Sequence, residues 1–247
     1  MSKGLDDWAC SYSGCDGGDL SSDIWLCGIE WGYEKATEEE RQNYYKNILP
    51  EEINAGEQAL NEIYNFFADE SMSFPFNLAF AKLYSAVKNG VVSEYKKNEG
   101  AILKLNLSPI AFRSDDELLW GESLISATGF NKKCDFIAYM NNLNRFVRIT
   151  EYYKPKLIIC IGSGYRNDFI KGFFGGDKAK LERQAIKPEP SNKNQNNRYV
   201  SYAYHNDTLL VVIPFSTSPN GLNSNHLLQA VGNKIRELLT KNGSSCV

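Results

Sequence analysis

The sequence predicts an α/β protein, specifically a three-layer α/β/α sandwich with a central, mainly parallel four-stranded sheet. Two observations lead to this prediction. Apolar runs that consist mostly of Ile, Leu and Val lie at 24–29, 101–107, 156–162 and 209–215. Such runs suit a parallel sheet that is covered on both faces. Helical patterns lie between the runs, and strands that alternate with helices are typical of this architecture.

Helical segments are expected at 37–49, 51–67, 76–90, from 114, at 135–153 and from 223. The first begins with Thr-x-x-Glu at 37–40, which is a capping box, and a second capping box lies at Ser114–Glu117. The helix at 76–90 ends in a glycine that suits a helix C-cap. The helix at 135–153 stops before Pro155, and the last helix carries apolar residues on one stripe.

One domain is expected to span all 247 residues, with a flexible insertion at 175–198. The insertion is rich in Lys, Asn and Pro and has few large apolar residues, so we interpret it as a mobile surface segment. The alternative is a basic arm that contacts phosphate. A formal net charge of -3 provides no broad attraction to nucleic acid or to an anionic membrane.

The cysteines and the amino terminus indicate a reducing compartment. Cys27 and Cys160 lie inside apolar runs, where a thiol behaves as a small buried hydrophobe. The amino terminus lacks the order of a signal peptide, and no apolar run reaches membrane-spanning length. We therefore expect a cytoplasmic protein without a membrane partner, and we infer no obligate protein partner.

No cofactor and no metal are expected. The histidines, His205 and His226, form no zinc-type pair with cysteines, and Cys10 and Cys15 belong to no complete cluster pattern. No Walker loop or nucleophile elbow is present in the sequence either.

Polar residues follow each apolar run, at the edge where open α/β sheets bind ligands. Glu30 lies between Gly28 and Gly32, so the backbone can approach a ligand closely there. Its carboxylate is a candidate general base or a partner for a developing cation. The alternative is a solvated loop acid or a helix-terminus residue. Trp31 and Tyr33 would stack on a planar ring or pack on the helices that follow.

The later strands end in groups that suit a nucleotide. Asn106 offers a donor and an acceptor for a nucleobase edge, although the amide could equally cap the next loop. The Gly-Ser-Gly at 162–164 is a candidate anion site, with Ser163 as its side chain. The hydroxyls and amides of 216–225 would grip phosphate or sugar, or would form a turn with an N-cap. Candidate contacts in this last loop are Ser216, Ser218 and Asn220.

The order of these motifs resembles the uracil-DNA glycosylase superfamily. Gly-Ile-Glu-Trp-Gly at 28–32 stands where that family has its first motif, and Asn106 stands where its members read the base. The strand and glycine at 154–163 are similar to its third motif, and Ser-Thr-Ser-Pro at 216–219 is similar to its His-Pro-Ser-Pro-like loop. The resemblance covers roughly residues 20–240, through short motifs.

The resemblance implies a DNA glycosylase, with DNA as its partner, that hydrolyses the N-glycosidic bond of a flipped base and leaves an abasic site. Glu30 would orient the attacking water and stabilise the positive charge on the sugar. The base would be held by Ile29, Trp31, Tyr33, Asn106 and Ser216, and DNA phosphates by Ser163, Ser218 and Asn220.

Two departures from the family pattern bear on the substrate. Trp31 replaces a small residue or proline, and Ser216 replaces a histidine that stabilises the leaving base. They favour a modified, damaged or bulky phage-type base over plain uracil, and hence a role in DNA repair or in defence against phage. A catalytically silent module that binds nucleic acid or a modified base is the alternative. An enzyme that acts on free nucleosides or nucleotides is a third hypothesis.

Overall fold

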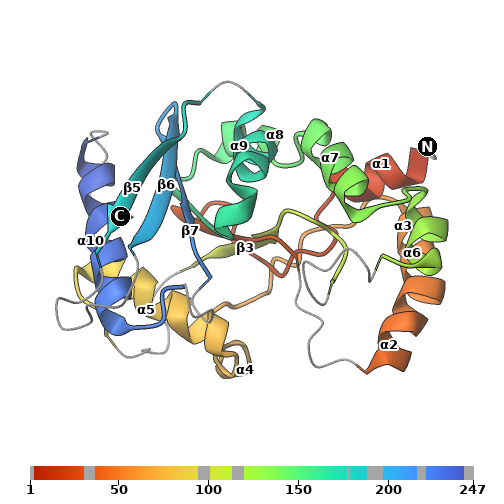
Figure 1. Cartoon of the computed structure of the whole chain (residues 1–247), viewed down its shortest axis with the longest axis horizontal. Helices are drawn as coiled ribbons and strands as arrows, with labels where there is room; N and C mark the ends of the chain where they lie inside the picture. The colour runs from red at the N-terminus through yellow and green to blue at the C-terminus, as the bar shows by residue number, and fades with distance from the viewer. Residues whose placement is uncertain are drawn as a thin grey trace.

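The computed structural model describes residues 3–30, 37–93, 101–112, 120–176, 179–187, 197–215 and 221–241. Within these residues the chain forms one mixed sheet with helices around it (Figure 1). The strand order is β1-β3-β2-β4-β7-β6-β5.

The four predicted strands are confirmed, and they are parallel neighbours at the centre of the sheet. They are β2 (Ile24–Gly28), β3 (Leu103–Asn106), β4 (Leu157–Ile161) and β7 (Thr208–Ile213). Almost every residue in them is buried, which explains why the apolar runs are nearly continuous.

The prediction of a four-stranded sheet is wrong, because three antiparallel strands extend it in the described part of the chain. They are β1 (Gly17–Gly18), β5 (Glu182–Ile186) and β6 (Arg198–His205). These strands do not have the continuous apolar composition of a central strand: four of the five residues of β5 are exposed. β5 also falls inside the segment predicted as an insertion, of which 177–178 and 188–196 lie outside the described residues.

Helices pack on both faces of the sheet, which is the layering that an α/β/α sandwich requires. On one face, α5 (Pro75–Asn89) and α10 (Asn225–Lys241) share a buried cluster with Leu26 and Ile159. On the other face, α9 (Arg166–Phe174) shares a cluster with Trp25 and Cys160. Alternate residues of one strand thus serve the two clusters, as the strand geometry dictates.

A third cluster joins helices beside the β3 side of the sheet (right in Figure 1). Its core includes Trp8, Leu49, Phe112, Phe136 and Met140. The helices involved are α1 (Lys3–Cys10), the π-helix η1 (Tyr44–Ile48), α3 (Leu49–Ala55), α6 (Glu122–Thr128) and α7 (Lys133–Leu143).

The helix ends were predicted well where a capping residue marks them. The capping box of Thr37 and Glu40 is present at the start of α2 (Glu38–Asn43). Gly90 has a left-handed conformation at the end of α5, and α10 covers most of the predicted last helix. The capping box predicted at Ser114–Glu117 lies outside the described residues.

Two predicted helices are shorter than expected. The helix predicted at 51–67 ends at Ala55, because Gly56 has a φ of 78° and the chain then forms turns that bury Phe66 and Phe67. The helix predicted at 135–153 is two helices, α7 and α8 (Val147–Tyr153), separated at Asn144 with a φ of 51°. Two short elements, α4 (Asp69–Met72) and the 3-10 helix η3 (Ser163–Tyr165), were not predicted.

Among the described residues, no helix combines the length and the apolar composition needed to cross a membrane.

Candidate functional site

The carboxyl ends of the parallel strands meet at one edge of the sheet, and hydrogen bonds continue the strands into their loops. Leu107 N donates to Gly28 O at 3.0 Å, and Ser108 N donates to Ile29 O at 2.7 Å. Gly162 N donates to Ile213 O at 2.9 Å. The first two bonds fix the backbone directly before Glu30, and the third joins the ends of β4 and β7.

The structure brings four of the predicted site residues to this edge: Ile29, Glu30, Asn106 and Ser163. The other five, Trp31, Tyr33, Ser216, Ser218 and Asn220, lie outside the described residues.

Glu30 is held by a buried lysine. Lys133 Nζ lies 3.2 Å from Glu30 Oε1, and the two side chains are 6% and 11% exposed. Lys133 Nζ also lies 4.2 Å from the centre of the Phe112 ring. Glu30 is therefore an oriented, largely buried carboxylate rather than a solvated loop acid. Sequence reasoning missed Lys133, since a lysine at the start of a helix gives no signal of burial.

Asn106 is buried, and the nitrogen of its side-chain amide makes a hydrogen bond within the fold. Its Nδ2 donates to Gly14 O at 2.7 Å, which fixes the orientation of the amide. Its Oδ1 packs against Gly28, where an added Cβ would lie 2.5 Å from that oxygen. No described residue donates a hydrogen bond to Oδ1, so the acceptor end of the amide is the part that a ligand could use.

Ile29 is a packing residue in this structure. Its side chain is 4% exposed and belongs to the cluster under α9. The Ile29 Cδ1 atom would lie 2.5 Å from a Cβ on Gly162, whose φ of +133° also favours glycine. The Ile29 side chain thus fills space under the edge of the sheet and is apolar. Its backbone oxygen already accepts a hydrogen bond from Ser108 N.

Ser163 is exposed and begins η3 directly after β4. The guanidinium of Arg166 donates to Ser163 O at 3.0 Å, so a positive charge accompanies the predicted anion site. Arg166 was not among the predicted site residues, and a single arginine after the Gly-Ser-Gly gives no distinctive signal in the sequence.

A buried arginine on the segment between α7 and α8 fastens the end of β3 to the amino-terminal segment. Arg145 donates to the backbone oxygens of Ser11, Ser13, Asn106 and Leu107, with Asn106 O at 2.7 Å from Nη1. Burial lowers the pKa of its guanidinium, and nearby thiols oppose that effect. Arg145 therefore fixes the backbone that carries Asn106, and the sequence gives no sign of this contact.

The described cysteines are free thiols. Burial raises the pKa of Cys15 to about 11, against the opposing effect of Arg145. Burial, together with the adjacent Cys27 thiol, raises the pKa of Cys160 well above its ordinary value. Because the thiolate is the reactive form, the raised pKa makes Cys15 and Cys160 poor nucleophiles. Within the described ranges, no group of His, Cys, Asp and Glu could hold a metal ion.

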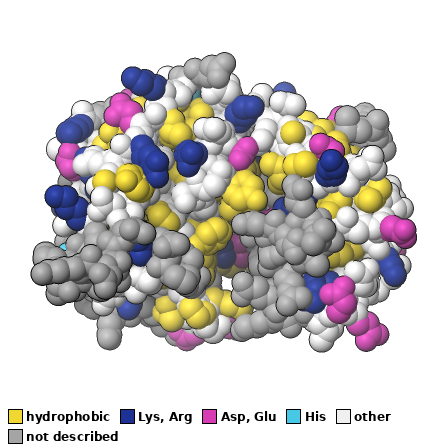
Figure 2. Space-filling model, in the orientation of Figure 1, with side chains coloured by type: hydrophobic (Ala, Val, Ile, Leu, Met, Phe, Trp, Pro, Cys, Tyr) yellow, Lys and Arg dark blue, Asp and Glu magenta, His cyan; other side chains and the backbone are white. Residues whose placement is uncertain are grey.

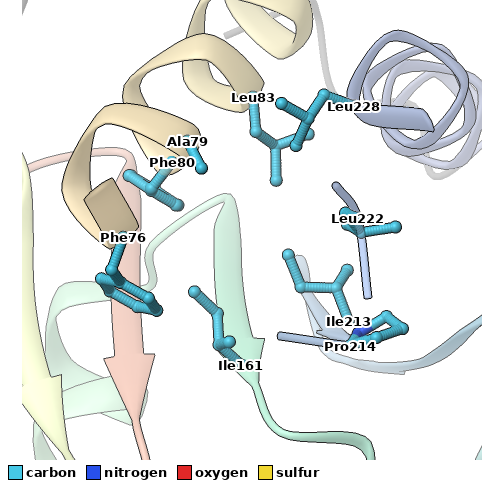
Figure 3. A pocket seen from close by; sticks show the side chains of 9 residues that line it. All are labelled: Phe76, Ala79, Phe80, Leu83, Ile161, Ile213, Pro214, Leu222 and Leu228. Carbon is cyan, nitrogen blue, oxygen red and sulfur yellow. The ribbon is translucent and has the colours of Figure 1, made fainter. Parts of the chain in front are cut away.

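A small apolar cavity of about 10 Å³ lies behind the edge, between α5, α10 and the ends of β4 and β7 (Figure 3). Its lining is Phe76, Ala79, Phe80, Leu83, Ile161, Ile213, Pro214, Leu222 and Leu228. The volume is close to that of one water, but this lining gives a water no polar partner. The cavity is therefore a packing defect of the core and not a polar binding site.

A larger hollow of about 270 Å³ lies between η1 and α6. It is lined by Gln42, Tyr45, Lys46, Gly121, Glu122, Ser123 and Leu124. On the face drawn in Figure 2, Lys and Arg side chains are scattered among acidic ones over the described residues.

The fold and the edge define an α/β protein in which two adjacent parallel strands lead to an oriented carboxylate, Glu30, and to a buried amide, Asn106. Comparison of the chain with protein-family models, with curated proteins and with solved structures found no match.

Proposed function

We propose that the protein is a DNA glycosylase that hydrolyses the N-glycosidic bond of a flipped base and leaves an abasic site. One observation carries the proposal: the Glu30 carboxylate is largely buried and ion-paired two residues after β2, and Asn106 ends the adjacent parallel strand β3, opposite Gly28. The carboxyl edge of an open α/β sheet is where ligands bind. A fixed carboxylate there suits a reaction that develops positive charge on a sugar.

In the proposed mechanism the target nucleotide leaves the duplex, at a cost of about a few kcal/mol in unstacking. Trp31 or Tyr33 stacks on the base, and Asn106 accepts a hydrogen bond from its edge. Glu30 orients the attacking water and stabilises the sugar cation while the bond to the base breaks.

The remaining predicted contacts complete the proposed binding mode. Ser163, with Arg166 beside it, binds a phosphate of the extruded strand. Ser218 and Asn220 hold a second phosphate, and Ser216 faces the leaving base. Because Trp31 and Ser216 replace the residues that are usual in the uracil-DNA glycosylase superfamily, we infer a modified or damaged base as the substrate.

The proposal is tested with duplexes that carry uracil, deaminated purines, alkylated bases or hypermodified cytosines. The protein is incubated with each duplex, and alkali then converts abasic sites into strand breaks. We expect breaks on one of these duplexes, and Glu30→Gln should form them at a much lower but still measurable rate. Glu51→Gln, at an exposed position in α3, is the matched control and should leave the breaks unchanged. A wild-type protein that breaks none of the duplexes would refute the proposal.

A second candidate is a catalytically silent module that binds DNA or a modified base. Two contacts favour it: Glu30 is committed to Lys133, and the amide nitrogen of Asn106 is committed to Gly14. Such a module would bind DNA with an affinity that falls as salt rises, would cut no duplex, and would bind equally well as Glu30→Gln.

A further inference from the structure

We propose that Lys133 is a positioning residue for Glu30: its ammonium group fixes the orientation and the negative charge of the carboxylate that acts on the sugar. This inference rests on the proposed glycosylase function. Lys133 acts through Glu30 and is not itself given a contact with the substrate.

The place of Lys133 in its helix is the first argument. Lys133 is the first residue of α7, directly after the N-cap position of Lys132. The amino terminus of a helix carries partial positive charge, so a cation is disfavoured there. Lys132 is exposed and is surrounded by solvent, whereas Lys133 is buried at this unfavourable end. The carboxylate of Glu30, 103 residues away in the sequence, is a partner that compensates for this position.

The backbone around Glu30 is the second argument. The hydrogen bonds that join β2 to the segment after β3 reach Ile29 O, the residue directly before Glu30. The bond from Lys133 Nζ to Glu30 Oε1 then restrains the Glu30 side chain itself.

The surroundings of the pair are the third argument. The ring of Phe112 lies under the ammonium group, and Phe112 itself packs on Trp120 at a ring distance of 6.0 Å. Phe136 and Met140 anchor α7 in the same cluster. In such surroundings an opposite charge at 3.2 Å favours the ionised carboxylate and resists its rotation. A carboxylate held in one orientation is what water activation requires.

The test compares three substitutions on the duplex that the wild-type protein cuts, with kcat and KM measured separately. We expect Lys133→Met to lower kcat by about 100-fold, the loss typical of a misplaced catalytic group, and to leave KM nearly unchanged. Lys133→Arg keeps the charge and should restore part of the lost rate. Lys132→Met removes the same charge from the adjacent exposed position and should behave as wild type.

A double substitution separates positioning from a general effect on the fold. If Lys133 acts through Glu30, Lys133→Met should change no remaining rate in a Glu30→Gln background. Because the double variant removes both charges of the buried pair, it leaves neither charge buried without its partner. Should Lys133→Met fail to fold, Lys133→Gln replaces it under the same criteria.

Wild-type kcat in Lys133→Met would overturn the inference while the glycosylase function stands, and so would an equal loss of rate in the Glu30→Gln background. If the wild-type protein cuts no duplex, the proposed function fails and this inference falls with it.

Discussion

Arg145→Met should be the most destabilising charge substitution near the edge of the sheet. The guanidinium donates to four backbone oxygens, those of Ser11, Ser13, Asn106 and Leu107. A buried acceptor that loses its partner costs about 1–3 kcal/mol. Part of this loss is offset, because the variant no longer has a guanidinium whose burial costs desolvation free energy. At the lower end of that range, four acceptors give a net loss of about 3 kcal/mol in the free energy of unfolding.

Urea unfolding followed by circular dichroism measures this loss. For a chain of this length, a loss of about 3 kcal/mol corresponds to a Tm lower by about 6–12 °C. Arg148→Met is the matched control, because Arg148 is exposed on α8, and its effect should stay within about 0.5 kcal/mol. If the two variants lose the same stability, the reasoning that Arg145 fastens the amino-terminal segment to β3 is wrong.

Two further substitutions test a polar contact between α7 and α9 and a steric contact at the edge of the sheet. Burial raises the pKa of Asp168 above its ordinary 3.8, and its partner Asn141 has a buried Oδ1 with no donor, so Asp168→Asn supplies that donor. The folded state keeps the Asp168 proton to higher pH than the unfolded chain does, so the charged carboxylate destabilises the fold at neutral pH. Asp168→Asn should therefore raise the free energy of unfolding by about 0.5–1 kcal/mol at neutral pH and leave it unchanged near pH ~3. An equal gain at both pH values in thermal unfolding would contradict this. Gly28→Ala places a Cβ 2.5 Å from Asn106 Oδ1 and should cost about 1–3 kcal/mol. Gly121→Ala meets no atom within 4 Å, and equal urea midpoints for the two variants would count against the close contact.

The centre of the sheet was predictable because its signal is local. A strand buried on both faces needs apolar residues at every position, and β4 shows this directly in the sequence. The outer strands were missed for the same physical reason. β6 mixes buried and partly exposed side chains, and β5 is mostly exposed, so neither forms a continuous apolar run.

The site was predictable only in part, because the side chains that hold Glu30 and Asn106 in place are far from them in the sequence. Glu30 and Asn106 lie at or just after the ends of strands that the sequence marks by continuous apolar runs, and parallel strands bring their ends together. Lys133 and Arg145 reach those strand ends from the region of α7 across 103 and 39 residues. Their places depend on how α7 packs in the third cluster, and no local pattern in a single sequence encodes that packing.

Asn106 connects the fold to the proposed function in a way that limits what the site can recognise. The hydrogen bond from Asn106 Nδ2 to Gly14 O holds the amino-terminal segment against β3. At the other end of the amide, Oδ1 lies against Gly28, where a side chain would collide with it. Under the proposed function, the amide therefore meets the base chiefly as an acceptor, through Oδ1. A base that presents an N–H group at this position would satisfy Asn106, whereas a base that presents a carbonyl oxygen there would leave two acceptors facing each other. Since a buried acceptor without a donor is costly, the proposed function predicts that Asn106 would select among bases by the donor that they carry.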